Sequence, residues 1–271
     1  MDDLHQICLE VRRQIIEMTS RAGSGHPGGS LSAVEILVAL YFYKMRVSPA
    51  RPKEATRDRF VLSKGHAAPG LYAVLAQRGY FPKESLCEFR QLHSFLQGHP
   101  DSKKCPGVDL STGSLGQGFS AACGTALGAK LLGLESQIYV LCGDGELQEG
   151  LIWGASEAAA HYKLDNLTLL VDNNGLQIDG ANREVMDLRD IGEKFHAFGF
   201  EVIRVQDGND LEEIISALDT PRITGKPRLI LAATVKGKGI SFMENRVEWH
   251  GKAPNAQQRE QALAELELEE S

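Results

Sequence analysis

The sequence predicts an α/β fold, a doubly wound and mostly parallel sheet with helices on both faces. Five short segments that are almost entirely apolar support this prediction, at 59–62, 138–142, 167–171, 200–205 and 229–235. Helical patterns separate these segments, and uninterrupted apolar strands are typical of parallel sheets that are buried on both sides. A chain of 271 residues, 42% of them hydrophobic, is long enough to bury the core of such a fold.

The first helices follow from apolar residues that recur at intervals of three or four positions. Residues 4–22 show this spacing, and residues 31–43 repeat it. Ser32 and Glu35 have the spacing of a capping box, which predicts that the second helix begins at Ser32. We expect both helices to bury their apolar stripes in the core.

Three later helices are predicted from local patterns. Small residues at 120–126 predict a helix packed closely against another helix, and residues 147–160 suit a crossover helix between two strands. Asp210 is placed to cap a helix over residues 211–218. The tail, residues 257–270, is acidic and helix-prone, and we expect it to be an exposed end.

The charge, the cysteines and the hydropathy of the sequence argue against several classes of protein. The chain has 29 basic and 36 acidic residues and a net charge of −7, whereas nucleic-acid-binding proteins usually carry a basic surplus. Its 5 cysteines include no C-x-x-C pair and are expected to be free thiols. The N-terminus lacks a signal-peptide pattern, and no apolar run reaches the roughly 18 residues of a membrane-spanning helix. We expect a soluble cytoplasmic protein that binds neither nucleic acid nor membranes.

Polar residues follow two neighbouring predicted strands. Asp144, between two glycines, comes after the strand at 138–142, and Asn174 follows the strand at 167–171. Because the carboxyl ends of parallel strands meet at one edge of a sheet, we expect the two side chains to lie close together. A carboxylate and an amide oxygen suit Mg²⁺ or Ca²⁺ that also binds phosphate oxygens. The glycines allow the backbone to approach a phosphate closely.

The spacing G-D-G-(x)4-G at 143–150, followed by N-N at 173–174, resembles the thiamine diphosphate signature. Further blocks resemble transketolase in order: S-G-H-P-G at 24–28, F-V-L-S-K-G-H at 60–66, G-H-P at 98–100, P-G-V at 106–108, S-T-G-S-L-G-Q-G at 111–118 and W-H-G-K at 249–252. The resemblance covers only the first domain of a complete transketolase. It implies one thiamine diphosphate-binding domain over residues 1–271, with the pyrimidine-binding and C-terminal domains on a separate chain.

The resemblance implies which residues bind the cofactor and a metal ion. Asp144 and Asn174 would bind Mg²⁺ through their side chains and Leu176 through its backbone carbonyl, with Ca²⁺ as an alternative ion. The residues that it assigns to thiamine diphosphate are His66, Gly113, Ser114, Leu115, Gly143, Asp144, Gly145, Glu146, Asn174, Lys236 and His250.

The same resemblance assigns four histidines and one glutamate to catalysis. His26 and His99 would contact the hydroxyls or the carbonyl oxygen of the donor sugar, and His66 and His250 would approach the diphosphate and the reacting centre. Imidazoles suit these tasks because their pKa lies near the working pH. Glu149 matches the family glutamate that links two cofactor sites across the subunit interface.

The implied activity is that of the N-terminal subunit of a split transketolase. Such an enzyme uses thiamine diphosphate and Mg²⁺ to transfer a two-carbon ketol unit from a ketose phosphate to an aldose phosphate. The group that activates the aminopyrimidine lies in the missing domain, so a C-terminal transketolase subunit is expected as partner, in an α2β2 heterotetramer. The sugar phosphates stay open between the pentose phosphate pathway and a dedicated route of sugar degradation.

Other classes remain as alternatives. The α subunit of a 2-oxoacid dehydrogenase also contains G-D-G and N-N but lacks the S-G-H-P-G and W-H-G-K blocks, and this short chain does not fit 1-deoxyxylulose-phosphate synthase. A nicotinamide-dependent oxidoreductase would need G-x-G-x-x-G after its first strand, which is absent. A non-catalytic cofactor-binding subunit is opposed by the intact histidines together with Asp144 and Asn174.

Overall fold

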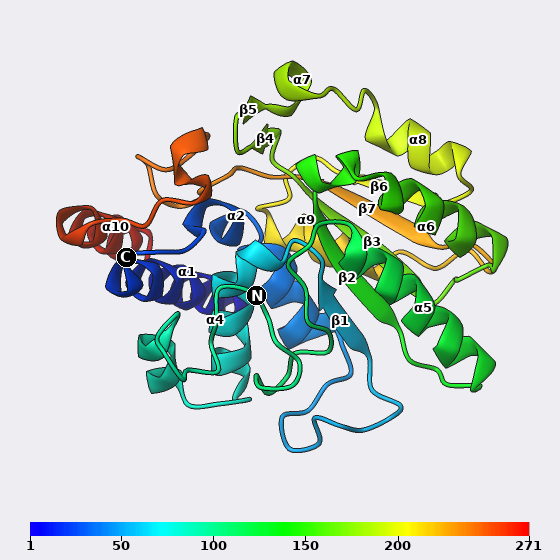
Figure 1. The fold of residues 1–271 in the computed structure, drawn as a ribbon, viewed down its shortest axis with the longest axis horizontal. Coiled ribbons are helices and arrows are strands. Elements are labelled where there is room, and N and C mark those ends of the chain that lie inside the picture. The colour runs from blue at the N-terminus through cyan, green and yellow to red at the C-terminus, as the bar shows by residue number, and fades with distance from the viewer. Residues whose placement is uncertain (271) are drawn as a thin grey trace.

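A sheet of five parallel strands forms the centre of the protein (Figure 1). The structure is a computed structural model that describes residues 1–270. In spatial order the strands are β1 (Arg59–Leu62), β2 (Ile138–Gly143), β3 (Leu167–Asn173), β7 (Arg228–Ala233) and β6 (Glu201–Val205). Every neighbouring pair in this sheet runs parallel. The predicted doubly wound α/β fold is confirmed, and all the predicted strands are present.

Helices cover both faces of the sheet. One face is covered by α1 (Asp2–Ala22), α3 (Val34–Val38), α4 (Ala68–Arg78) and α9 (Leu211–Asp219), and the other by α5 (Gln117–Leu131), α6 (Gly150–His161) and α8 (Ile191–Ala197). Shorter elements are α2 (Pro27–Leu31), α7 (Asn182–Val185), the π-helical η1 (Ala39–Lys44), the 3₁₀ helices η2 (Gly65–Ala67), η3 (Lys83–Glu88), η4 (Gly145–Gln148) and η5 (Val247–His250), and the hairpin of β4 (Leu176–Gln177) and β5 (Gly180–Ala181). The C-terminal α10 (Ala256–Glu270) lies beside α1 (Figure 1).

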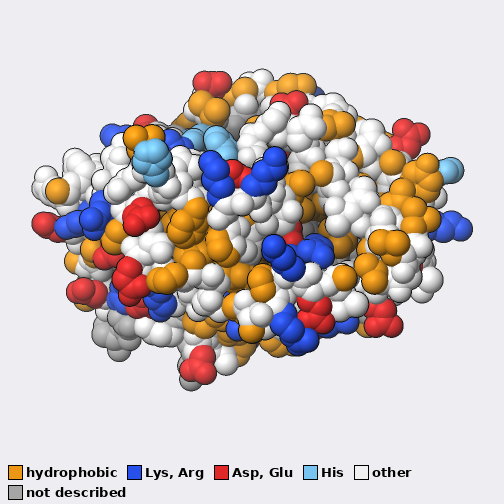
Figure 2. All heavy atoms as spheres, turned by 60° about the horizontal axis from the view of Figure 1, so that its bottom comes forward, with side chains coloured by type: hydrophobic (Ala, Val, Ile, Leu, Met, Phe, Trp, Pro, Cys, Tyr) orange, Lys and Arg blue, Asp and Glu red, His pale blue; other side chains and the backbone are white. Residues whose placement is uncertain are grey.

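The surface mixes charged and apolar side chains. On the face drawn in Figure 2, Lys and Arg side chains lie among Asp and Glu side chains, with apolar side chains scattered between them. Among residues 1–270, no helix combines the length and the apolar character that crossing a membrane requires. The cysteines are free thiols, as the sequence predicts, and all of them except Cys87 are buried.

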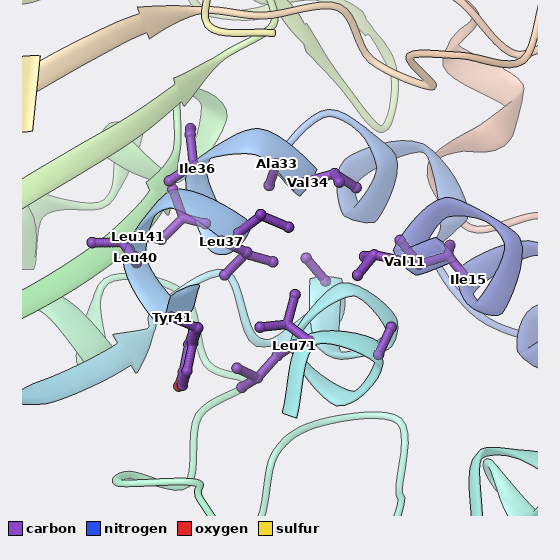
Figure 3. Packing of buried hydrophobic residues seen from close by; sticks show 14 of the residues in the cluster. Val11, Ile15, Ala33, Val34, Ile36, Leu37, Leu40, Tyr41, Leu71 and Leu141 are labelled. Atoms are coloured by element: carbon purple, nitrogen blue, oxygen red, sulfur yellow. The ribbon is translucent and has the colours of Figure 1, made fainter. Parts of the chain in front are cut away.

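Alternation along the strands explains why both faces of the sheet are apolar. Phe60 and Leu62 of β1 belong to the cluster under α1 and α4, whereas Val61 between them belongs to the cluster under α5 and α6. Figure 3 shows the first cluster, in which Val11 of α1 and Leu71 of α4 point toward one another. Each such side chain, when fully buried, contributes about 1.5–3 kcal/mol. The two clusters fix the sheet between its helical layers, with the carboxyl ends of the strands at one edge.

The prediction of a single helix over residues 31–43 is wrong. The chain instead forms α2, then α3, and then the π-helical η1. The capping box is also absent, because the hydroxyl of Ser32 donates to the carboxylate of Asp172 on β3. Glu35 forms a buried ion pair with Arg12 of α1 at 2.7 Å. Tertiary contacts therefore use both residues of the predicted cap.

The C-terminal tail is helical as predicted, but it is not an exposed end. Helix α10 contacts α1, and Ala262 and Leu266 are fully buried in the core. The carboxylate of Glu265 accepts hydrogen bonds from the backbone N–H and the hydroxyl of Ser241, at 2.7 and 2.8 Å. Ala262 and Leu266 are one helical turn apart, so they share the face that α10 buries.

The other helix predictions agree with the structure. Oδ1 of Asp210 accepts hydrogen bonds from the backbone N–H groups of Glu212 and Glu213, at 2.8 and 3.2 Å, and so caps α9. These N–H groups have no intrahelical partner at a helix start. The crossover helix expected over 147–160 is present as η4 and α6, and α5 contacts α6.

Replacing the cap of α9 tests this local analysis. The substitution Asp210→Ala should lower the free energy of unfolding by about 1 kcal/mol, because two N–H groups lose their acceptor. Asp210→Asn keeps a side-chain oxygen at the same place and should lose much less. Urea denaturation of the three proteins measures the difference, and equal losses for both variants would show that the hydrogen bonds are not its source.

Candidate functional site

A cavity of about 510 Å³ lies at the carboxyl edge of the sheet. The loops that follow β1, β2, β3 and β7 line it, together with residues of α2 and η5. The predicted site residues in its wall are His26, His66, Gly113, Leu115, Gly143, Asp144, Gly145, Glu146, Glu149, Asn174, Leu176, Lys236 and His250. His99 and Ser114 lie outside the wall. The structure thus brings together most of the residues that the sequence analysis singled out.

Several wall residues were not predicted. They are Gly29, Lys64, Gln148, Gln177, Ile178, Asp179 and Met186. Lys64 stands inside the block at 60–66, so the sequence does contain a signal for it. Ile178 lies at the turn between β4 and β5, and Met186 directly follows α7. These elements are too short to show a periodic pattern, which is why the sequence analysis missed them.

Asp144 and Asn174 come together at the ends of β2 and β3. Oδ1 of Asp144 accepts a hydrogen bond from the N–H of Gly145 at 2.8 Å, and Oδ2 accepts one from the N–H of Gly175 at 2.5 Å. The second bond brings the loop after β3 against Asp144. Oδ1 of Asn174 accepts a hydrogen bond from the N–H of Leu176 at 3.1 Å. A carboxylate and an amide oxygen therefore lie at one place, and the nearby carbonyl of Leu176 accepts a hydrogen bond from Nζ of Lys236 at 3.1 Å.

This donor set fits a divalent cation. Burial raises the pKa of Asp144 to about 6, and the negative charge of nearby Asp172 adds to the effect. A bound cation would stabilise the ionised carboxylate and offset this burial. In the part of the chain that the structure describes, no three His, Cys, Asp or Glu side chains form a metal site. Oxygen ligands from a phosphate or from water would therefore have to complete the coordination of Mg²⁺ or Ca²⁺.

The carboxylate of Glu146 connects three segments of the cavity wall. Its Oε1 accepts hydrogen bonds from the hydroxyl of Ser63 and from the N–H of Gly116, the latter at 2.9 Å. Its Oε2 accepts one from the N–H of Gly143 at 3.1 Å. Burial raises the pKa of Glu146, and these hydrogen bonds oppose the rise. Glu146 therefore positions the loops as well as lining the cavity.

Lys64 and Asp172 form a buried ion pair beside the cavity, with side chains 3% and 0% exposed. The Nζ of Lys64 also donates to the carbonyl oxygen of Gly29 at 2.8 Å. The hydroxyls of Ser32 and Thr234 donate to the carboxylate of Asp172. Burial alone would raise the pKa of Asp172, but the charge of Lys64 and these hydrogen bonds lower it. The pair thus connects the ends of β1 and β3 with α2 and with the loop after β7.

Three histidine rings meet in the cavity. The ring centroids lie 5.2 Å apart for His26 and His66, 5.5 Å for His26 and His250, and 5.0 Å for His66 and His250. The Nζ of Lys236 donates to Nδ1 of His250 at 3.0 Å, so the proton of a neutral His250 lies on Nε2. The Nδ1 of His26 is buried and has no hydrogen-bond partner among the described residues.

The environment keeps these imidazoles neutral. Burial lowers the pKa of His26 to about 4, and the positive charge of Arg90 contributes. Burial and the charge of Lys236 lower the pKa of His250 to about 3, and burial puts that of His66 well below its ordinary value. Burial also lowers the pKa of Lys236 to about 8, which leaves it mostly cationic at neutral pH. The cavity thus offers neutral hydrogen-bonding rings beside fixed positive charges.

The remaining predicted residues lie near the cavity. A Cβ at Gly113 would lie 3.1 Å from Cδ2 of His99, so the His99 ring packs against that backbone. Burial and the charge of Arg90 lower the pKa of His99. Ser114 is exposed. Glu149 is also exposed, and its backbone carbonyl opens α6 by accepting the N–H of Ile152 at 3.1 Å.

Comparison with protein families and curated proteins gives a consistent result. Residues 5–270 match the family model described as transketolase, thiamine diphosphate binding domain. The chain is 43% identical to an apulose-4-phosphate transketolase subunit of Actinobacillus succinogenes, over 99% of this chain and 97% of that protein. It is 44% identical to 6-deoxy-6-sulfo-D-fructose transketolase subunit SqwG of Clostridium sp. (strain MSTE9), over 98% and 97% of the two chains.

Solved structures agree with this result. The chain superimposes on transketolase from Pichia stipitis in complex with sedoheptulose 7-phosphate with a TM-score of 0.93 and 33% sequence identity. The match covers 97% of this chain and 40% of that one, so the chain spans two fifths of the length of that transketolase. The sheet and its two helical layers therefore have the architecture of a transketolase domain.

The neutral state of the cavity histidines predicts how stability depends on pH. Because their pKa values are lowered in the folded protein, the unfolded chain binds more protons between about pH 6.5 and 4. The free energy of unfolding should therefore fall as the pH is lowered through this range. His26→Gln and His250→Gln should each make the fall less steep.

Urea denaturation at several pH values measures these slopes. His196→Gln, at an exposed position of α8, is the matched control and should keep the slope of the unmodified chain. Identical slopes for the cavity variants and the control would contradict the buried, neutral state assigned to these rings.

Proposed function

The chain belongs to the transketolase family, in which it matches the thiamine diphosphate binding domain, and we propose that it is the N-terminal subunit of a split transketolase. The proposed reaction transfers a two-carbon ketol unit from a ketose phosphate to an aldose phosphate. The observation that carries the proposal is the cavity itself. In it, the oxygen donors of Asp144 and Asn174 lie in one wall with the His26, His66 and His250 cluster.

The residues at the ends of β2 and β3 would hold the cofactor by its diphosphate. Asp144, Asn174 and the carbonyl of Leu176 would bind Mg²⁺, with diphosphate oxygens completing its coordination. Lys236 lies in the same wall and would offset the negative charge of the diphosphate, whereas the charge of Lys64 is already paired with Asp172. When bound, thiamine diphosphate supplies a nucleophilic carbon and an electron sink for breaking and re-forming a carbon–carbon bond next to a carbonyl.

The histidines would bind and orient the sugar. His250 carries its proton on Nε2 when neutral, so it can donate to a substrate oxygen that gains negative charge. The ring of His26 lines the cavity and would form a hydrogen bond with a hydroxyl of the donor. His99 packs against Gly113 outside the cofactor cavity, which is consistent with contact to the sugar rather than to the diphosphate. Burial of the rings lowers their proton affinity and keeps them available for these bonds.

The proposed partner is a C-terminal transketolase subunit. This chain matches relatives that are themselves named as transketolase subunits over nearly their whole length, while it spans two fifths of the Pichia transketolase. The pyrimidine-binding and C-terminal domains would then reside on the partner, in an α2β2 assembly. Glu149 is exposed at the start of α6, as a residue that links two cofactor sites across an interface would have to be. The free thiols support a cytoplasmic location.

Activity of the separate chains tests the partner. This chain and the candidate partner should each be inactive with thiamine diphosphate, Mg²⁺ and a ketose phosphate, and a mixture of the two should release an aldose. The reason is that, in this proposal, the aminopyrimidine side of the cofactor binds to the partner chain. Turnover by this chain alone would contradict the proposal. Release of CO₂ from a 2-oxoacid by the mixture would instead favour the dehydrogenase alternative.

Substitution of the proposed metal ligand tests the cofactor site. In the assembled enzyme, Asp144→Asn should weaken Mg²⁺-dependent binding of thiamine diphosphate by about 100-fold or more. Replacing a residue that only hydrogen-bonds to a metal ligand already lowers metal affinity by about 10–100-fold, and loss of a ligand should cost at least as much. Asp179→Asn removes a carboxylate from the exposed rim of the same cavity and is the matched control. Calorimetric titration measures both affinities. Equal affinities for the two variants would exclude Asp144 as a metal ligand.

A further inference from the structure

Arg90 lies between the two segments that carry the proposed sugar-binding histidines. Its Nη1 donates to the hydroxyl of Ser24 at 2.8 Å, just before His26 in the chain. On its other side the guanidinium fills the space beside Gly98, the residue before His99. A Cβ at Gly98 would lie 2.7 Å from Nη2 of Arg90. One side chain therefore contacts both segments.

Packing alone does not explain an arginine at this position. The backbone of Arg90 has a φ of 59°, in the left-handed region that side chains other than glycine rarely adopt. Its Nε is buried and has no hydrogen-bond partner among the described residues. A buried donor without a partner destabilises the folded state. A methionine could fill similar space without leaving that donor unpaired.

The charge of Arg90 acts on both histidines. Its guanidinium contacts the Ser24 hydroxyl and the face of the Phe89 ring, neither of which carries a charge. Burial is the largest cause of the lowered pKa of His26 and of His99, and the positive charge of Arg90 is the second largest for both. The other groups that face His26 are His99, Lys236 and the rings of His66 and His250, and none of them is acidic.

We propose that Arg90 is a positioning residue of the site. It fixes the segments that carry His26 and His99 relative to each other, and its charge keeps both rings available as neutral hydrogen-bonding groups for the hydroxyls of the donor ketose. The identity of the ligand rests on the proposed function, whereas the link between Arg90 and the two histidines rests on the contacts alone. Arg90 itself lies outside the wall of the cofactor cavity, so the proposal gives it no contact with the diphosphate.

Two variants separate the contacts of Arg90 from its charge. Arg90→Met removes both, and Arg90→Lys keeps the charge but loses the planar group that reaches Ser24 and Gly98 together. Lys104→Met is the matched control, because Lys104 is an exposed cation that shares an outer cavity with Arg90. All are assembled with the partner chain. Steady-state kinetics with the donor ketose as a function of pH, and calorimetric titration of the cofactor, give the readouts.

For Arg90→Met we expect the KM of the donor to rise about 10-fold or more with a smaller change in kcat, since binding of the donor is what the two segments support. The affinity for thiamine diphosphate should stay as in the unmodified enzyme. The acid limb of kcat/KM should move to higher pH, because removal of a nearby cation raises the pKa of a histidine. Arg90→Lys should restore the acid limb but not the KM.

Arg90 has no such role if Arg90→Met keeps the KM and the acid limb of the unmodified enzyme, or if Lys104→Met changes them equally. Should the unmodified assembly lack transketolase activity, the proposed function fails, and a second measurement still decides the role of Arg90. NMR titration of the histidine Cε1–H signals of this chain should then show higher pKa values for His26 and His99 in Arg90→Met. Unchanged values would overturn the inference.

Discussion

The buried ion pair of Lys64 and Asp172 is the interaction on which the candidate site depends. It joins the end of β1 to the end of β3, and through the hydroxyls of Ser32 and Thr234 it also fixes α2 and the loop after β7. Both side chains are buried, so replacing either one with a neutral residue would destabilise the fold by about 3–5 kcal/mol. His26, His66, Asn174 and Lys236 each lie within three residues of a member of this network.

The cations of the cavity have two effects that oppose each other once an anion is present. Lys236 would attract a diphosphate, and the positive charges of Lys236 and Lys64 disfavour protonation of His66 and His250. A diphosphate bound beside these cations would cancel part of their field and raise the pKa of the rings toward ordinary values. Binding of the cofactor would therefore also prepare the histidines to move protons. Cofactor binding and protonation of the histidines would then be coupled through charge.

The sequence predicts the sheet well because strands buried on both faces must be apolar throughout. It also predicts that Asp144 and Asn174 lie together at one edge of the sheet, since parallel strands bring the residues that follow them to the same edge. It fails at Ser32, whose hydroxyl bonds Asp172 across the fold rather than capping a helix. It fails again at α10, where contact with α1 buries Leu266 in an otherwise acidic helix. Arg90 lies outside all the sequence motifs described above. A side chain that connects two distant segments leaves no local sequence pattern from which it could be predicted.

The network around Asp172 also has a consequence for how the chain folds. Its bonds join residues that are 108, 140 and 62 positions apart in sequence. Contacts of such high sequence separation form late, because the entropy of closing long loops must be overcome first. We therefore expect the cavity to form only once the sheet is assembled, so that a cofactor would bind to the folded chain. A cofactor that binds only the folded chain would stabilise it against unfolding.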